Sequence, residues 1–492
     1  MLQFDLNSKN ADSKKNPWQK GHLSTRTKKI FVLCASCLAA AFFMTVVVRA
    51  WTLRKAVPAP LSGAEKTTLN ALLDARYPQR TDILAQLPYK VIPAELDVGA
   101  KSAIAIDAAN GNILYEKNAD EVIPPASMTK LIVLYVVFQE IATGRIHLDD
   151  VVPLPPEAWA CNMPPHSSLM FLGKNQIVTL EELMLGSAIC SGNDAAYAIA
   201  GYVAGSMDAF IARMNAEVSA LGLTHTHFEE ASGYSEKNTT TAREMAAFTK
   251  VYLERYPESL HKFHSKLSLT YPQEHNLPWE DRALPKAQDF SHGLPERITM
   301  PIYQKNTNPL LGALEGCDGL KTGYIEESGY NLALTARQNG TRFISITMGG
   351  LGNNTKEGQE GRVHDGTEIM EWAFRTFADY KNPLLLREYS IPLVFARAQR
   401  INLVPAYKPE ALCVPIVAAR NKEEPLSDVR INLVLPAVLK GTMSAGDEHG
   451  AIEYYLGENL LQRIPLVAER SEKRASPWLC AADLFAQLSL KL

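Results

Sequence analysis

The longest apolar run in the chain covers residues 30–48, which read IFVLCASCLAAAFFMTVVV and carry no charge. A helix of this length spans about 28 Å, close to the hydrocarbon thickness of a bilayer. Lys28 and Lys29 lie directly before the run, and positive flanks stay on the cytoplasmic side. We therefore predict a basic cytoplasmic tail over residues 1–29, a membrane segment over 30–50 and an exported remainder.

The membrane segment is either cleaved as a signal peptide or retained as an anchor. Val48 and Ala50 are small residues at the two positions that a signal peptidase reads, which favours cleavage. The apolar run is longer than the roughly 7–15 residues of an ordinary signal-peptide core, which favours a retained anchor. We expect the anchor, and a mature protein that begins at Trp51 would contradict this expectation.

The pattern after the membrane segment changes twice. Residues 51–87 open with prolines and then become helix-like, which predicts a stalk. Over residues 88–380, strand-like runs come first, then a block of helix-like runs, then more strands and a closing helix. The strand-like runs are 102–106, 112–117, 320–325, 331–337 and 342–348, with the hairpin signal Asn110-Gly111 between the first two. The helix-like runs are 131–138, 180–189, 194–204, 206–221 and 367–380.

This order predicts an α+β domain over residues 88–380, in which helices pack on an antiparallel sheet. Residues 271–300 hold four prolines and little periodicity, which predicts a long loop within that domain. Residues 383–475 consist of short strand-like runs separated by turns, which predicts a small all-β domain. Residues 476–492 then form a tail.

Composition excludes several classes of protein. The 492 residues are 46% hydrophobic and 21% charged, which is typical of globular proteins and excludes wholesale disorder. The formal net charge is −3, and because the N-terminal tail is basic, the body is acidic. Nucleic-acid binding needs clustered Lys and Arg, so we do not expect it. The seven cysteines show no metal-binding spacing, and we expect neither a metal nor a disulfide framework.

Ser127 and Lys130 form a Ser-x-x-Lys motif directly before the buried helix-like run 131–138. At a helix start the Ser hydroxyl lies near free backbone N–H groups, and a Lys three residues on shares its face. In a low-dielectric site the pKa of a lysine falls, so that its neutral amine accepts the Ser proton. The spacing alone is weak evidence, because Ser259 and Lys262 repeat it in a polar stretch.

A second motif, Ser191-Gly192-Asn193, lies between two helix-like segments. By itself an ordinary turn or helix cap is the simpler interpretation. As chemistry, Ser191 would relay a proton between the nucleophile and the Lys, and Asn193 would hold a substrate carbonyl.

The third motif, Lys321-Thr322-Gly323, lies on a predicted strand before Tyr324, and a solvated strand end is its simplest interpretation. As chemistry, Lys321 and Thr322 offer a charge and a hydroxyl to a carboxylate. Gly323 lets an extended substrate backbone come close. The amide of Tyr324 would pair with that of Ser127 as an oxyanion hole.

In this order and on these elements, the three motifs are the set found in penicillin-binding proteins and class A β-lactamases. The chain resembles one subgroup in particular, the low-molecular-mass penicillin-binding proteins that act as serine-type D-alanyl-D-alanine carboxypeptidases. The resemblance covers residues 88–380 and, weakly, 383–475. It is carried by residues 125–131, 168–172, 191–195, 221–223, 241–243 and 318–350.

The resemblance implies a penicillin-binding/β-lactamase-like transpeptidase fold. It implies a hydrolase that removes the terminal D-Ala from peptidoglycan stem peptides, needs no cofactor, and is inhibited covalently by β-lactams. The implied location is the periplasmic side of a bacterial inner membrane.

The implied catalytic residues are the acylated nucleophile Ser127, the general base Lys130 and the proton relay Ser191. The implied substrate-binding residues are Asn193, Lys321, Thr322, Gly323, Tyr324 and Arg362. Arg362, ten residues before Trp372, fits the place where the family has an Arg near the substrate carboxylate.

Two departures from the family pattern stand out. The family usually anchors by an amphipathic C-terminal helix after a cleaved signal, whereas here the N-terminal segment is the stronger candidate. The 130 residues between Ser191 and Lys321 also exceed the usual spacing, and the 271–300 loop accounts for the excess.

Two alternative functions remain open from sequence. A β-lactamase or penicillin-recognising esterase would share the acylation and deacylate fast. A class A β-lactamase needs a water-activating Glu between the second and third motifs; no such signature is evident, although Glu229 and Glu230 lie there. A non-catalytic cell-wall-binding protein of the same fold is the other alternative.

Overall fold

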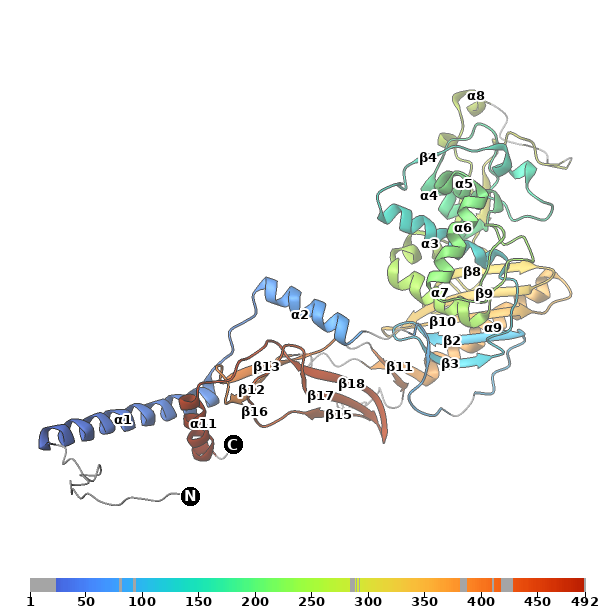
Figure 1. The fold of residues 1–492 in the computed structure, drawn as a ribbon. Coiled ribbons are helices and arrows are strands. Elements are labelled where there is room, and N and C mark those ends of the chain that lie inside the picture. Colours follow the sequence, from blue (N-terminus) through green and yellow to red (C-terminus); the bar gives the residue numbers. More distant parts are fainter. Residues whose placement is uncertain are drawn as a thin grey trace, which may run out of the picture.

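The computed structural model describes residues 24–78, 82–91, 94–283, 288, 290–291, 293–380, 387–408, 411–416 and 428–490. The protein is elongated (Figure 1). Helix α1 (Thr25–Lys55) and the C-terminal helix α11 (Pro477–Leu490) lie together at one end, and the short helix α8 (Trp279–Arg282) lies at the other. Two six-stranded sheets lie between these ends.

The sheet nearer to α8 has the strand order β1-β3-β2-β10-β9-β8. Its strands are β1 (Ala85–Gln86), β2 (Ser102–Asp107), β3 (Asn112–Lys117), β8 (Cys317–Ile325), β9 (Gly329–Gln338) and β10 (Thr341–Gly350). Neighbouring strands are antiparallel, apart from the parallel pair β1 and β3. The predicted hairpin and the three predicted later strands are therefore confirmed.

Helices cover both faces of this sheet. One side carries α3 (Thr129–Ala142), α4 (Leu180–Leu185), α5 (Asn193–Ala204), α6 (Met207–Ala220) and α7 (Ala242–Arg255), and α9 (Thr355–Thr376) covers the other. Ile104 and Ile106 of β2 join the first core, while Ala103 and Ala105 join the second. Successive side chains of a strand point to opposite faces, so this double cover explains the unbroken apolar run of β2.

The predicted helical runs are confirmed, with one change of boundary. The run 131–138 is buried throughout within α3, as its composition predicts. The closing helix, expected over 367–380, instead begins at Thr355, and its expected end forms strand β11 (Phe377–Tyr380). The first turns of α9 contain glycines and charged residues, so they lack the apolar periodicity that reveals a helix.

The second sheet has the strand order β15-β17-β18-β13-β12-β16. Its strands are β12 (Tyr389–Val394), β13 (Arg400–Pro405), β15 (Val429–Val434), β16 (Leu439–Lys440), β17 (Glu448–Leu456) and β18 (Asn459–Ala468). One further strand, β14 (Leu412–Pro415), pairs with β11 and so ties the two units together. This sheet has a hydrophobic core of its own, built around Leu393, Leu403 and Ile452.

Helix α2 (Gly63–Arg76) lies within residues 51–87, the stretch predicted to be a helix-like stalk. Leu69 and Leu73, one helical turn apart, are buried against Val467 of the second sheet. Their spacing gives α2 one apolar face, and that face packs on the β unit instead of standing in solvent.

The tail predicted over 476–492 contains α11, which packs against α1. Arg49 of α1 forms a buried ion pair with Asp483 of α11, with 2.5 Å between Nε and Oδ1. Helix α1 is also long and apolar enough to cross a membrane.

The predicted 271–300 loop connects β6 (Ser268–Tyr271) to β7 (Ile302–Lys305), which pair with each other. It contains α8 and is fastened to the segment before α4. The Gln176 side chain bonds to Ile298 O at 2.8 Å and to the Tyr271 hydroxyl at 2.9 Å. The loop is therefore an excursion at the far end of the molecule, as Figure 1 shows.

Candidate active site

Ser127 lies in a strained turn at the start of α3. The short 3₁₀ turn η1 (Ala126–Met128) carries it, and Ala126 has a left-handed φ of 48°. Such a backbone costs about 1–3 kcal/mol outside glycine and persists where the surroundings enforce it, as at active sites. The Ser127 side chain is thus held in place by a turn that packing maintains.

Lys130 is fully buried, and three oxygen atoms surround its amine. Nζ donates to Ser127 Oγ at 3.0 Å, to Asn193 Oδ1 at 2.8 Å and to Ser232 O at 2.6 Å. Burial lowers the pKa of Lys130 to about 7, although the negative charges of Glu230 and Asp194 act in the opposite direction. At neutral pH a large fraction of this amine is therefore unprotonated and can accept a proton.

The second motif meets the first at the turn before α5. The π-helical turn η4 (Gly186–Cys190) ends at Ser191, whose φ of 59° is also left-handed. The buried Ser191 hydroxyl has no hydrogen-bond partner among the described residues. Asn193 places its side-chain oxygen on Lys130, so only its amide nitrogen is left for the expected contact to a substrate carbonyl.

Asp194 was not among the predicted site residues, yet it fixes the second motif. Its buried carboxylate accepts hydrogen bonds from the amides of Met170, Phe171 and Leu172, at 2.8–2.9 Å. These contacts explain why residues 168–172 accompany the motif. A charged residue at a helix start beside the motif was the only sequence signal of this role.

The third motif lies on β8 beside the first two. Lys321 is 1% exposed, and its Nζ donates to Thr322 O at 3.0 Å. Burial and, secondarily, the charges of Lys130 and Arg362 hold the pKa of Lys321 well below its usual value. Thr322 donates to Thr307 Oγ1 at 2.9 Å, a neighbour that sequence gave no signal for, because it follows the aperiodic loop.

Gly323 brings β8 against the Ser127 turn. A Cβ at this position would lie 2.6 Å from Pro125 O and 3.2 Å from Ser127 N. The sequence suggested that this glycine makes room for a substrate. The structure gives a second reason, since the glycine lets the strand itself approach the nucleophile turn.

Arg362 reaches the same strand from α9. Its side chain is 6% exposed, donates from Nη2 to Gly323 O at 3.3 Å and lies over the Tyr330 ring at 5.0 Å. Burial lowers the pKa of Arg362 to about 10. Tyr324, half exposed, packs its ring against Tyr330 at 4.4 Å.

Three basic side chains therefore lie close enough to influence one another electrostatically: Lys130, Lys321 and Arg362. None of them forms an ion pair with a described carboxylate, and Arg362 Nε has no partner among the residues described. Each raises the electrostatic cost of charging the others. A bound anion would relieve this repulsion.

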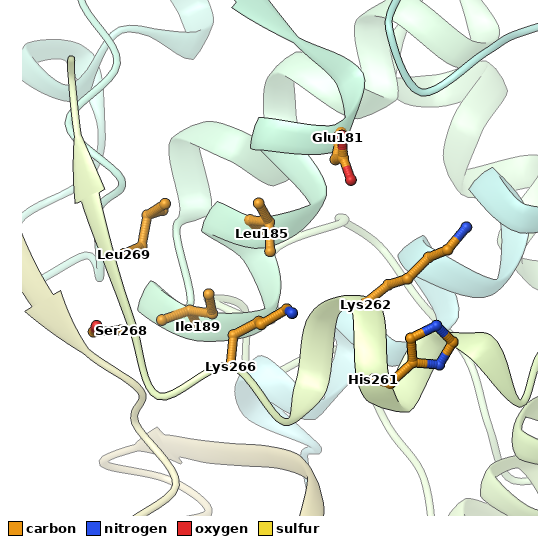
Figure 2. A pocket seen from close by; sticks show the side chains of 8 residues that line it. All are labelled: Glu181, Leu185, Ile189, His261, Lys262, Lys266, Ser268 and Leu269. Atoms are coloured by element: carbon orange, nitrogen blue, oxygen red, sulfur yellow. The ribbon is translucent and has the colours of Figure 1, made fainter.

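The second Ser-x-x-Lys spacing does not belong to this site. Lys262 instead lines a separate pocket of about 270 Å³, as Figure 2 shows. Ser259 is buried in the protein. The pocket is lined by Glu181, Leu185, Ile189, His261, Lys262, Lys266, Ser268 and Leu269, none of which belongs to the three motifs.

Among the residues that the structure describes, no group of three or more His, Cys, Asp or Glu side chains is placed to hold a metal ion. All seven cysteines are free thiols.

The fold and this site together define a serine hydrolase of the penicillin-binding class. Residues 89–352, more than half of the chain, match peptidase family S11, D-alanyl-D-alanine carboxypeptidase. The chain belongs to this family.

Individual relatives agree with the family match. The chain is 31% identical over 384 residues to the D-alanyl-D-alanine carboxypeptidase DacA of Escherichia coli K12, which covers 77% of this chain and 84% of the relative. The structure of penicillin binding protein 5 from Haemophilus influenzae aligns with a TM-score of 0.62 and 26% identity, over 78% of this chain and 100% of the other. Penicillin binding protein 6B from Escherichia coli gives a TM-score of 0.58 and 27% identity, over 78% and 99%.

Replacing Gly323 with Ala should separate β8 from the Ser127 turn. The added methyl group would meet Pro125 O at 2.6 Å, and we expect kcat/KM for D-Ala release to fall at least about tenfold. Gly361→Ala is the matched control, because its methyl group would come no closer than 3.5 Å to Leu351 O. Wild-type kinetics in a folded Gly323→Ala protein would contradict this account of the glycine.

Proposed function

We propose that this serine carboxypeptidase removes the terminal D-Ala from peptidoglycan stem peptides through an acyl-enzyme on Ser127. One observation carries the assignment: the buried amine of Lys130 lies 3.0 Å from Ser127 Oγ, with its pKa lowered to about 7. A neutral amine at that distance can take the hydroxyl proton as the oxygen attacks.

The proposed reaction has two halves. In acylation, Ser127 Oγ attacks the carbonyl carbon of the penultimate D-Ala, and its proton passes to Lys130. The tetrahedral intermediate then collapses, the peptide C–N bond breaks, and the D-Ala amine takes up a proton as it leaves. In deacylation, water attacks the ester carbonyl and Ser127 recovers its proton.

Two further groups fit this sequence. We assign the proton transfer to the leaving amine to Ser191, because its buried hydroxyl is uncommitted among the described residues. We assign the developing oxyanion to the amides of Ser127 and Tyr324, since β8 lies directly against the Ser127 turn at Gly323.

We assign the substrate carboxylate to the cationic side of the site. Lys321 and Arg362 have no carboxylate partner among the described residues, and Thr322 adds a hydroxyl. A C-terminal carboxylate satisfies these donors, whereas an internal peptide lacks the charge. Asn193 would contact the substrate through its amide nitrogen.

β-Lactams present the same carboxylate and a strained amide to the same nucleophile. The penicillin binding proteins that this chain resembles are named for that property. We therefore propose that β-lactams acylate Ser127.

Benzylpenicillin should add one mass increment to the purified full-length protein, seen by intact mass spectrometry from seconds to hours. Ser127→Ala should lose the adduct, because the acylated oxygen is gone. Ser259→Ala should keep it, although Ser259 has the same spacing to a Lys.

The other outcomes identify the alternatives. An adduct that disappears while the drug is consumed would indicate a β-lactamase or esterase. Absence of any adduct would favour a non-catalytic wall-binding protein.

We also propose that α1 is retained as an anchor and that the enzyme works on the periplasmic side of the inner membrane. The Arg49–Asp483 pair is buried, and Leu53 is fully buried beside Val394 and Ala486. Cleavage after Ala50 would remove Arg49 and leave the buried Asp483 charge without its cation, which is energetically costly. The structure thus favours retention over cleavage.

This anchoring suggests a division of labour between the two units. We propose that residues 88–380 carry catalysis, and that the β unit over 383–475, with α2 packed on it, holds the site away from the membrane. The arrangement in Figure 1 supports this, because α1 and α11 lie at the end opposite α8.

Protein purified from membranes should have an intact mass that includes the segment before Trp51. The reason is structural, since Arg49 forms a buried ion pair with Asp483 of the folded body. A mature N-terminus at Trp51 would overturn the anchor proposal and leave the catalytic proposal untouched.

A further inference from the structure

The loop that runs from Glu229 to Asn238 passes directly against the Ser127 motif. Gly233 lies so close that a Cβ there would fall 1.8 Å from Ala126 O and 2.8 Å from Ser127 N. At the end of the loop, Asn238 Nδ2 donates to Thr129 Oγ1 at 3.2 Å. The shape of this loop therefore determines what surrounds the nucleophile.

The loop also provides one of the three acceptors of the Lys130 amine. Ser232 O receives the shortest of the three hydrogen bonds from Nζ, at 2.6 Å. Ser232 is 1% exposed, so solvent does not compete for this carbonyl. A displaced Ser232 would leave a buried donor on Lys130 unsatisfied.

One carboxylate holds the loop in this shape. Glu230 Oε2 accepts from both the amide and the hydroxyl of Ser232, each at 2.6 Å. Its Oε1 accepts from Asn238 Nδ2 at 3.2 Å and from the Ser235 amide at 3.4 Å. All four donors belong to the loop itself.

We propose that Glu230 is a positioning residue of the active site, which fixes the Ser232 carbonyl against Lys130 and places a compensating negative charge behind the Lys130 amine. This inference rests on the proposed function, because it assigns Lys130 the part of the base. Glu230 acts on the reaction through Lys130 and touches no reacting atom.

The geometry argues against the other use of a glutamate at this place. A water-activating base needs a free carboxylate oxygen facing the acyl group. Both oxygens of Glu230 are already occupied by loop donors. Glu230 thus supports the base instead of replacing it, which agrees with a carboxypeptidase.

Titratable groups from several elements surround the Lys130 amine. Glu230, from the loop, and Asp194, from the start of α5, raise the pKa of Lys130 against the larger effect of burial. Lys321 of β8 also lies near the amine, and burial together with the charges of Lys130 and Arg362 holds the pKa of Lys321 well below its usual value. Burial and, secondarily, the charge of Glu230 raise the pKa of Tyr197 of α5.

The sign of the effect follows directly. Removing the negative charge of Glu230 lowers the pKa of Lys130, so the amine becomes a free base at lower pH. The acid limb of the acylation rate must then move to lower pH. Glu230→Asp, which keeps the charge, separates this shift from the effect of a changed loop shape.

The test compares Glu230→Gln, Glu230→Asp and Glu229→Gln by the rate of benzylpenicillin acylation between pH 5 and pH 9 on full-length protein. In Glu230→Gln, we expect the acid limb to move down by roughly 0.5–1 pH unit from its wild-type position near 7. Its plateau rate should fall by roughly 10- to 100-fold, because the Ser232 carbonyl loses its anchor.

The other two variants separate charge from position. Glu230→Asp keeps the charge but withdraws it from Ser232, so we expect a reduced plateau with the limb within a few tenths of wild type. Glu229→Gln removes an exposed neighbouring charge whose one ion pair among the described residues is with Lys237, at 3.6 Å, and this variant should behave as wild type.

Several results would overturn the proposal. If the acid limb of Glu230→Gln lies at the same pH as in wild type, or at higher pH, the proposed role of the charge is contradicted. A Glu230→Asp plateau equal to wild type removes the positioning role, and this variant decides the question if Glu230→Gln does not fold. Failure of the proposed function itself would look different, since the wild-type protein would then form no Ser127 adduct.

Discussion

A single buried amine organises this active site. A charged lysine in a protein interior costs several kcal/mol, and the cost is reduced by losing the proton or by meeting acceptors. Lys130 does both: its pKa is lowered to about 7, and three oxygens lie within 3.0 Å of Nζ. In the proposed mechanism, the same burial that makes the amine costly to charge allows it to act as the base for Ser127 near neutral pH.

The surrounding backbone serves this arrangement. Ser127, Ser191 and Lys321 come from segments far apart in the chain, and they meet only because the connecting backbone accepts close or strained contacts. Left-handed residues stand next to or at two of the motifs, at Ala126 and Ser191. Glycines let strand β8 and the Glu230 loop approach the nucleophile turn. Packing of α3 between the helices and the sheet stabilises these strained and close backbone conformations.

Apolar periodicity predicted the helices and strands whose buried residues recur at regular spacing. It missed features that depend on a few individual contacts. The hairpin, the fully buried α3 and strands β8 to β10 follow from apolar spacing and turn residues. The start of α9 does not, because its glycines and charged residues interrupt the apolar spacing. The packing of α2 on the β unit does not either, because it depends on the two buried leucines Leu69 and Leu73. The motif residues were predicted, whereas Ser232 was not, since its contribution is a backbone carbonyl. From sequence, Glu230 was a candidate only for activating water, whereas its hydrogen bonds to the loop support a positioning role.

The most direct test of this account is the titration of the Lys130 amine itself. The ¹³Cε signal of Lys130 in the full-length protein labelled with [ε-¹³C]lysine, assigned by its loss in Lys130→Arg, would be followed by NMR against pH. The account predicts a midpoint near pH 7 for this lysine. A midpoint near the ordinary value of 10.5 would contradict it, because the amine would then be fully charged when Ser127 has to give up its proton.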